Sequence, residues 1–431
     1  MGPRRTGTRG WWRSLRRGSG RGQLLVTVIV ALLLGGATYT ANEAAGRWQS
    51  ATVEEVKWSA AALEQIRFVY LDEATDAALI ARWENRATVL GELAAAGGNG
   101  LLAAEAETAR QTAAQKVFGL RGANALVAER FRLPGGGFDV VRRLAELRQQ
   151  EADPAEDSVP ALMAEGDRLR FIALVLALAC IPLVLVWVVF QAVAYTQHRS
   201  RRAESRPPDA ADGALVPHPW TAPQPKRRLT AAALAAWILV TLIPAWSLYV
   251  SCAGQRSDAE AARTAVTIST YIQASNLYSS QDLLQRRIII DLTQSGLSRQ
   301  LAAISLKDAA QDELGSAEVR AADSWSAIGA EMTRLPSTAD GIDAGLIRAM
   351  SATPEISSDA LQIQVAAAEL SDRAGSATNL FTLAATLAAL AMSLITLALA
   401  KPEAPAILTA AAIVLLAGAL FTAFAGAVTF L

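Results

Sequence analysis

The residue types that most often carry chemistry in proteins are scarce in this sequence. The chain of 431 residues has two histidines, His198 and His218, and two cysteines, Cys180 and Cys252. Catalytic triads, Cys–His pairs and zinc sites need such residues in clusters, and both histidines lie in a polar stretch apart from the apolar segments that hold the cysteines. The glycines at 135–137 lack the following Lys of a phosphate-binding loop. The sequence therefore predicts no catalytic, cofactor-binding or metal site, and a protein that is not an enzyme.

Two polar stretches occur at matched places in the two halves of the chain. Residues 65–76 read QIRFVYLDEATD and residues 273–282 read QASNLYSSQD, so in each a Gln is followed five residues later by a Tyr. Each Tyr lies roughly 40 Å beyond an apolar segment if the intervening residues are helical. Such a stretch is either a recognition surface or the core and solvated face of a helix. The candidate residues for extracytoplasmic recognition are Tyr70, Asp72, Asp76, Tyr278 and Asp282.

Five apolar segments must position these stretches. Each is about as long as the roughly 20 residues that a helix needs to cross a bilayer. Because lipid offers no hydrogen-bond partner to the backbone, we expect all five to be helices. A cleaved signal peptide is the alternative for the first segment, although its helical pattern continues past Ala41. The predicted spans are residues 24–41, 171–195, 230–253, 380–400 and 406–431.

The distribution of charge predicts the orientation of these spans. The tail at 1–23 and the link at 196–229 are basic, whereas residues 42–170 and 254–379 hold more acidic than basic side chains. Basic segments next to membrane spans stay in the cytoplasm. We therefore expect a multi-pass plasma-membrane protein with a cytoplasmic amino terminus, two long extracytoplasmic segments and a short cytoplasmic turn at 401–405.

The link at 196–229 has basic residues at both ends and six prolines between them. This composition predicts an extended or disordered segment that contacts anionic lipid head groups or a cytoplasmic protein. The candidate docking residues are Arg199, Arg201, Arg202, Lys226, Arg227 and Arg228.

The two long outer segments are predicted to be up-and-down helical bundles. In the first, the apolar pattern indicates a helix that ends at 97–100 and a second helix from 101 to about 132, before the break at Pro134. In the second, the first helix is expected to stop near Ser295 and Gly296. A shift of 208 residues superposes the spans and the Tyr residues of one half on those of the other, which indicates an internal duplication. The predicted fold class is an all-α membrane protein with five transmembrane helices and two extracytoplasmic up-and-down helical bundles, internally duplicated.

Small residues recur at four-residue steps in the last two spans. Such faces allow helices to approach closely, either within one chain or between subunits of an oligomer. The candidate packing residues are Ala385, Ala389 and Ser393 in one span and Gly418, Thr422 and Gly426 in the other.

The duplicated anchor-bundle-anchor layout, the stretch YLDEATDA at 70–77 and the basic link that leads through Arg227 and Arg228 into the third span resemble the GlnX-type membrane proteins of actinobacteria. Each half is also loosely similar to a chemoreceptor four-helix sensory domain. The resemblance implies an extracytoplasmic solute-binding protein and a cytoplasmic serine/threonine kinase as partners. The apolar spans predict contact with the lipid bilayer, and we expect no nucleic-acid partner. We expect a non-enzymatic membrane sensor or signalling adaptor, with a structural or assembly component of an envelope complex as the alternative.

Overall fold

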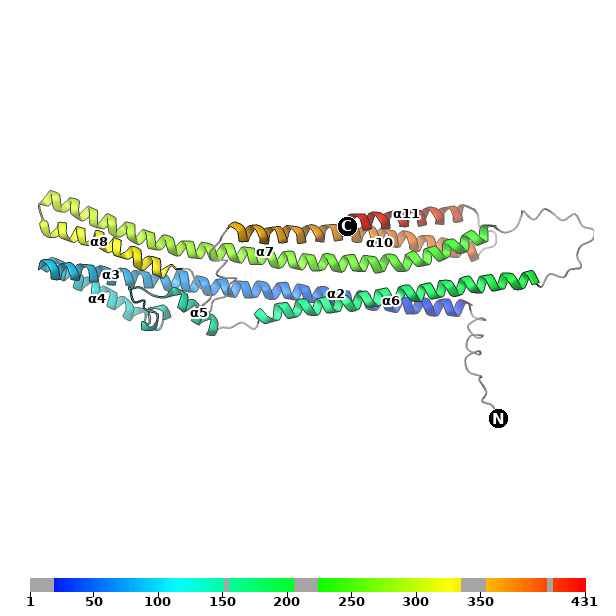
Figure 1. Cartoon of the computed structure of the whole chain (residues 1–431), viewed down its shortest axis with the longest axis horizontal. Coiled ribbons are helices and arrows are strands. Elements are labelled where there is room, and N and C mark those ends of the chain that lie inside the picture. The colour runs from blue at the N-terminus through cyan, green and yellow to red at the C-terminus, as the bar shows by residue number, and fades with distance from the viewer. Residues whose placement is uncertain (1–18, 151–154, 205–223, 335–353, 401–405) are drawn as a thin grey trace, which may run out of the picture. The chain divides into compact units, whose positions relative to one another are not determined.

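The computed structural model describes residues 19–150, 155–204, 224–334, 354–400 and 406–431 (Figure 1). Within these ranges the chain is almost entirely helical, and pairing of strand type is confined to one isolated bridge between Arg132 and Phe138. The helices are α2 (Ser19–Arg67), the π-helix η1 (Phe68–Glu73), α3 (Ala74–Gly97), α4 (Gly100–Leu120), the short 3-10 helices η2 (Ala125–Val127) and η3 (Glu129–Phe131), α5 (Val140–Gln150), α6 (Ala155–Glu204), α7 (Gln224–Leu306), α8 (Ala309–Met332), α10 (Pro354–Ala400) and α11 (Ala406–Phe430).

Five of the helical stretches in the described ranges are long and apolar enough to cross a membrane, in agreement with the five predicted spans. They lie in the continuous helical run of α2, η1 and α3, and in α6, α7, α10 and α11, and the mean hydropathy of their most apolar 18-residue segments lies between 1.7 and 2.7. Windows of this kind match the thickness of a bilayer core.

The chain divides into two compact units. Unit 1 comprises Met1–Thr52, Val159–Ala261 and Val365–Leu431, and unit 2 comprises Val53–Ser158 and Ala262–Gln364. The sequence predicted two separate bundles, one from each outer segment. Unit 2 instead combines residues of both segments, because their apolar faces are buried in one shared core.

Unit 1 is packed through alanine-rich helix faces. In α10 the buried positions follow a three- and four-residue rhythm and contact α7 and α11. Alanine at these positions lets the helix backbones approach closely, which is how apolar helices gain packing contacts within lipid. The buried small residues of this face are Ala377, Ala384, Ala388 and Ala391.

The face predicted for α10 differs from this buried face. Ala385 is partly buried, but Ala389 and Ser393 are exposed, because the helix presents Ala384 and Ala388 to its neighbours instead. In α11 the predicted face does meet α10. A Cβ added at Gly426 would lie 3.3 Å from the Ala377 carbonyl oxygen, and one at Gly418 would lie 3.7 Å from Leu387. Thr422, between these glycines, is half-buried.

A second contact in unit 1 joins α2 to α6, next to the apolar segments of these helices. Trp48 is fully buried, and its indole ring lies against Gly166, where an added Cβ would overlap the ring. Ion pairs flank this contact, with Arg47 3.3 Å from Glu165 and Arg256 3.1 Å from Asp167. A residue without a side chain is therefore required at 166 for the ring to fit.

Unit 2 has one main core that draws residues from both outer segments. Its largest fully buried side chains include Tyr70 from η1, Phe131 from η3, Leu144 from α5 and Trp325 from α8. A smaller cluster lies near the turns of the two helical hairpins, α3–α4 and α7–α8. It contains Leu90, Leu102, Ala106, Leu314 and Ala317.

Helix α4 ends earlier than the sequence predicted, at Leu120 rather than near residue 132. Gly122 has a φ of 83°, in the left-handed region that glycine tolerates, and Asn124 then caps η2 by accepting a hydrogen bond from the Leu126 N–H. A short irregular loop therefore replaces the last turns of the expected helix.

Helix α7 shows the opposite difference, since it passes through Ser295 and Gly296 and ends at Leu306. Gly296 is a contact point and not a break. A Cβ added there would lie 2.7 Å from the carbonyl oxygen of Gly315 in α8. The chain turns at Lys307, whose φ is 53°, and Asp308 caps α8 by accepting from the N–H groups of Ala310 and Gln311.

The basic link at 196–229 is also more helical than predicted. Helix α6 continues to Glu204 and α7 begins at Gln224, because the arginine-rich ends are good helix formers that extend the flanking helices. The middle of the link, the tail at 1–18 and the predicted turn at 401–405 lie outside the described residues.

Candidate functional site

The two matched tyrosines contact each other in unit 2. The ring centroids of Tyr70 and Tyr278 are 6.4 Å apart with an interplanar angle of 64°, an edge-to-face arrangement. The Tyr278 hydroxyl donates to the carbonyl oxygen of Thr333. The Tyr70 hydroxyl is buried and has no hydrogen-bond partner among the described residues. Burial raises the pKa of Tyr70, and to a smaller extent that of Tyr278.

The acidic residues of the predicted recognition surface lie apart from the buried Tyr70. Asp72 is exposed, with a carboxylate oxygen 3.6 Å from Arg67, and Asp282 lies 2.7 Å from Arg286 one helical turn away. Asp76 is half-buried in the first turn of α3. The tyrosines therefore belong to the core, while two of these acids form ion pairs at the surface.

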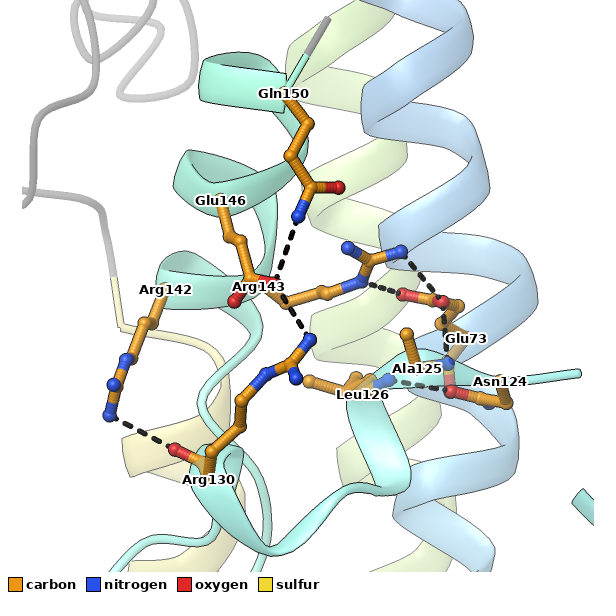
Figure 2. A network of polar contacts seen from close by, with 9 residues as sticks. All are labelled: Glu73, Asn124, Ala125, Leu126, Arg130, Arg142, Arg143, Glu146 and Gln150. Carbon is orange, nitrogen blue, oxygen red and sulfur yellow. Dashed lines mark hydrogen bonds and ion pairs between the residues drawn. The ribbon is translucent and has the colours of Figure 1, made fainter. Parts of the chain in front are cut away.

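The neighbouring Glu73 forms the most buried polar contact in this region (Figure 2). It ends the π-helix η1, in which Val69, Tyr70 and Glu73 are buried. Its carboxylate accepts hydrogen bonds from Arg143 Nε at 2.7 Å and Nη2 at 3.2 Å, and from the Ala125 N–H at 3.0 Å. Two-pronged pairing with a guanidinium is the strongest arrangement available to a carboxylate.

Asn124 attaches the loop after α4 to the same point. Its side-chain amide donates to the Glu73 carbonyl oxygen at 2.9 Å and accepts from the Leu126 N–H at 3.1 Å. On the outer side of α5, Glu146 accepts from Arg130 at 2.7 Å, and Arg142 donates to the Arg130 carbonyl oxygen at 3.0 Å (Figure 2). The network thus fixes the loop of residues 121–139 to both η1 and α5.

This loop completes an open pocket of about 410 Å³ in unit 2. Helices α3 and α4 supply its walls, and residues 121 and 132 belong to the loop. The volume is in the range of sites for small molecules. The lining residues are Glu84, Ala87, Thr88, Arg110, Ala113, Ala114, Val117, Phe118, Arg121 and Arg132.

The three arginines of this pocket differ in how their charges are compensated. Arg132 donates to both oxygens of Glu84 at 2.8 Å, which raises its pKa, and lies 5.1 Å from the Phe138 ring centroid. Arg110 pairs with Glu107 at 2.7 Å, with both side chains more than half exposed. Arg121 lies 5.9 Å from the ring centroid of Phe118 and forms no ion pair among the described residues.

Sequence reasoning missed most of this site. Glu73 was part of the acidic stretch but was not selected, although its spacing of three from Tyr70 places both on one helical face. Arg143 and Asn124 gave no signal, because their contacts to Glu73 join residues 70 and 51 positions apart. The pocket arginines are spread over α4 and the irregular loop after it, and this loop was predicted to be helical.

The predicted cytoplasmic docking residues fall on helix ends whose side chains lie outside the described residues. Arg199, Arg201 and Arg202 belong to the last turns of α6, and Lys226, Arg227 and Arg228 belong to the first turns of α7. Their role in docking stays a prediction.

Cys180 and Cys252 are both unpaired and buried. In the described ranges, no group of three or more His, Cys, Asp or Glu side chains is placed to hold a metal ion.

Comparison with known proteins adds no further constraint, because no family model, curated protein or solved structure matches the chain.

Proposed function

We propose that this protein is a non-enzymatic membrane sensor or signalling adaptor, in which unit 2 recognises a ligand or a solute-binding protein and the basic link contacts a cytoplasmic partner. The observation that carries the proposal is the continuity of α7. This helix of 83 residues contains an apolar segment long enough to cross a membrane, and it also contains residues of the unit 2 core. It is one continuous helix between the two. A relay needs an element that belongs to both the recognising part and the membrane segment.

The pocket supports the same proposal. A buried ion pair is a costly way to stabilise a helical core, since apolar residues of similar volume often do as well. Here the pair of Glu73 with Arg143 fixes the loop that supplies Arg121 and Arg132 to the pocket. We interpret the pair as a device that holds a recognition site in one geometry.

The orientation in our proposal follows from charge. The basic tail and link lie in the cytoplasm of the plasma membrane, and unit 2 lies outside, where a solute-binding protein can reach it. A cytoplasmic kinase is the partner class that the sequence resemblance implies for the link, with Arg199, Arg201, Arg202, Lys226, Arg227 and Arg228 as its docking residues.

One observation favours the alternative, a structural or assembly component of an envelope complex. Ala389 and Ser393 form a small-residue face of α10 that is exposed in unit 1. Faces of this kind pack against other transmembrane helices. An oligomer or a membrane partner that covers this face would make the chain a component of a larger membrane assembly.

The relay can be tested with a spin label at Ser205→Cys, in the full chain with Cys180→Ala and Cys252→Ala, reconstituted in lipid nanodiscs. Replacing Glu73 by Gln weakens the pairing that fixes the loop in unit 2. We expect this change to alter the electron paramagnetic resonance line shape of the label, because the shared helices transmit the rearrangement.

Glu64→Gln is the matched control, since Glu64 pairs with Arg67 at the surface. An unchanged line shape with Glu73→Gln, in protein that keeps its helical circular dichroism, would contradict the relay. The same cysteine checks the orientation. In intact cells a membrane-impermeant maleimide should label the exposed position Thr108→Cys and leave Ser205→Cys unlabelled.

We also propose that the chain arose by internal duplication of an ancestor that formed a dimer. Two pairs of residues that are equivalent under a shift of 208 contact each other. Tyr70 packs on Tyr278 (278 − 70 = 208), and Glu55 pairs with Arg263 at 3.1 Å with the same separation of 208. Contact between equivalent residues is what a two-fold axis between identical subunits produces.

The two helical turns in unit 2 support this proposal. Gly98 and Lys307 both have a left-handed backbone, with φ of 67° and 53° (307 − 98 = 209). The following residues, Asn99 and Asp308, both cap the next helix by accepting from N–H groups two and three residues later. The turns of the hairpins α3–α4 and α7–α8 thus share one structure, a residue with a left-handed backbone followed by a residue that caps the next helix.

A fused dimer predicts that its halves recognise each other. Residues 1–214 and 215–431, expressed together as separate chains, should co-purify from detergent extracts. Arg263→Glu in the second half should reduce the recovery of the first, because it places two carboxylates together at Glu55. Arg373→Glu is a matched control, since Arg373 pairs within its own helix at the surface. If the halves do not associate at all, the dimeric ancestor is the wrong explanation.

A further inference from the structure

The open pocket between α3, α4 and the 121–139 loop has the composition of a site for an organic anion. Its apolar lining residues include Ala87 and Ala113, which are buried, Val117, which is partly buried, and Phe118, which is 74% exposed. Its charged members are three arginines and one glutamate. Pockets that combine an apolar floor with a few oriented polar groups are typical of small-molecule sites.

The positive charge of the pocket is only partly cancelled. Arg132 donates to both oxygens of Glu84 and also lies 3.0 Å from the exposed Glu129, so the charge of this guanidinium is fully compensated. The pair of Arg110 with Glu107 is an exposed pair one turn apart, a type that contributes little and exchanges readily with other anions. Arg121 has no carboxylate opposite it among the described residues. An incoming anion would therefore meet one free and one exchangeable guanidinium.

The backbone leaves room for Arg110 on this side of α3. A Cβ added at Gly91 would lie 3.8 Å from Arg110 Nη2, so the guanidinium extends over a helix position that has no side chain. Near the carboxyl end of α4, the Arg121 guanidinium lies over the Phe118 ring, 5.9 Å from its centroid. A planar apolar group can stack on this ring while its charged end faces the guanidinium.

We propose that this pocket binds a small carboxylate that carries an apolar body about the size of one aromatic ring. The carboxylate pairs with Arg121, Arg110 adds positive charge to the same pocket, and the apolar body lies on Val117 and Phe118. Arginine suits this role because its planar fork donates two parallel hydrogen bonds to a carboxylate. The inference rests on the proposed role of unit 2 in recognition and adds the chemical class of the ligand.

The test uses 4-fluorophenylacetate as the probe and the full chain in lipid nanodiscs, with binding followed by broadening of the fluorine resonance. We expect saturable broadening for this carboxylate and none for the neutral 4-fluorophenylacetamide. Inorganic phosphate should compete only weakly, because it lacks the apolar body. Equal broadening by the acid and the amide would overturn the proposal.

Arg121→Gln should weaken binding of the probe by about tenfold or more, because it removes a charge-assisted contact. Arg67→Gln is the matched control. Like Arg110, Arg67 pairs with a glutamate three residues earlier at the surface, but it does not line the pocket. Both variants should keep the wild-type melting temperature. Equal affinities for Arg121→Gln and Arg67→Gln would place the probe elsewhere and overturn the assignment of the pocket.

The label at Ser205→Cys separates failure of this inference from failure of the proposed function. Probe binding that depends on Arg121 without a change at the label supports the pocket and contradicts the relay. A label that responds to Glu73→Gln in protein that does not bind the probe supports the relay and overturns the anion site.

Discussion

Replacing Arg143 by Met should lower the free energy of unfolding of unit 2 by about 3–5 kcal/mol. Both members of the Glu73–Arg143 pair are almost fully buried, with side-chain exposures of 3% and 8%. Removing the guanidinium leaves the Glu73 carboxylate in the core with the Ala125 N–H as its one remaining hydrogen-bond donor among the described residues. A buried charge without its partner costs more than the pair contributes when intact. Tryptophan fluorescence during chemical denaturation in nanodiscs would measure the loss.

Two further variants show whether the loss comes from the buried charge. Arg142→Met removes an exposed arginine one position away, whose side chain donates to the Arg130 carbonyl oxygen, so we expect a change below about 1 kcal/mol. The double variant Glu73→Leu with Arg143→Met replaces both charges by apolar groups and should recover most of the lost stability. A double variant as unstable as Arg143→Met alone would show that the pair acts through shape and not through charge.

The membrane-spanning helices could be predicted from the sequence because their signal is local. An uncharged run of about 20 residues needs no knowledge of its neighbours to be recognised as a span. The turn at Gly97–Gly100 was also predictable, since Gly98 supplies the left-handed backbone and Asn99 the helix cap. The corresponding turn between α7 and α8 was not predicted, because it depends on Lys307. A residue with a side chain rarely adopts a φ of 53°.

The structural role of a glycine could not be predicted where it depends on contact with another helix. Gly296 looks like a helix end in sequence, yet it allows α7 to touch α8 at Gly315. The same limit applies to the site. Glu73 meets Arg143 across 70 residues, and the pocket arginines come together only because α4 stops at Leu120 and a loop follows. No periodic pattern encodes contacts of this separation.

The two tyrosines show what a matched pattern can establish. Their equal spacing from apolar segments predicted that they hold matched positions, and in unit 2 the two ring centroids lie 6.4 Å apart. The pattern did not reveal that Tyr70 is completely buried, because a Tyr next to Asp72 and Glu73 reads equally well as a surface residue. Burial depends on the partner helix, which lies in the other half of the chain.

Tyr70→Ala should destabilise unit 2 by about 3–5 kcal/mol, the cost of truncating a large side chain in a packed core. Tyr70→Phe should instead stabilise unit 2. The Tyr70 hydroxyl is buried without a partner among the described residues, so removing it should raise the free energy of unfolding by about 1 kcal/mol. Tyr278→Phe is the matched control, because it loses the hydrogen bond to Thr333 and should lower stability by about 1 kcal/mol.

The pH dependence of these variants gives an independent check. Burial raises the pKa of Tyr70 in the folded protein above the value of 10.0 that it has when exposed. The contribution of Tyr70 to stability is therefore complete below about pH 10, and it is lost as the pH rises above this value, because the unfolded chain ionises first. Melting temperatures measured from about pH 8 to about pH 11, which brackets the ordinary tyrosine pKa of about 10, should fall less steeply for Tyr70→Phe than for the wild type. Parallel curves would mean that Tyr70 reaches solvent in the folded protein, and the two tyrosines would then have to be reconsidered as part of an open recognition surface.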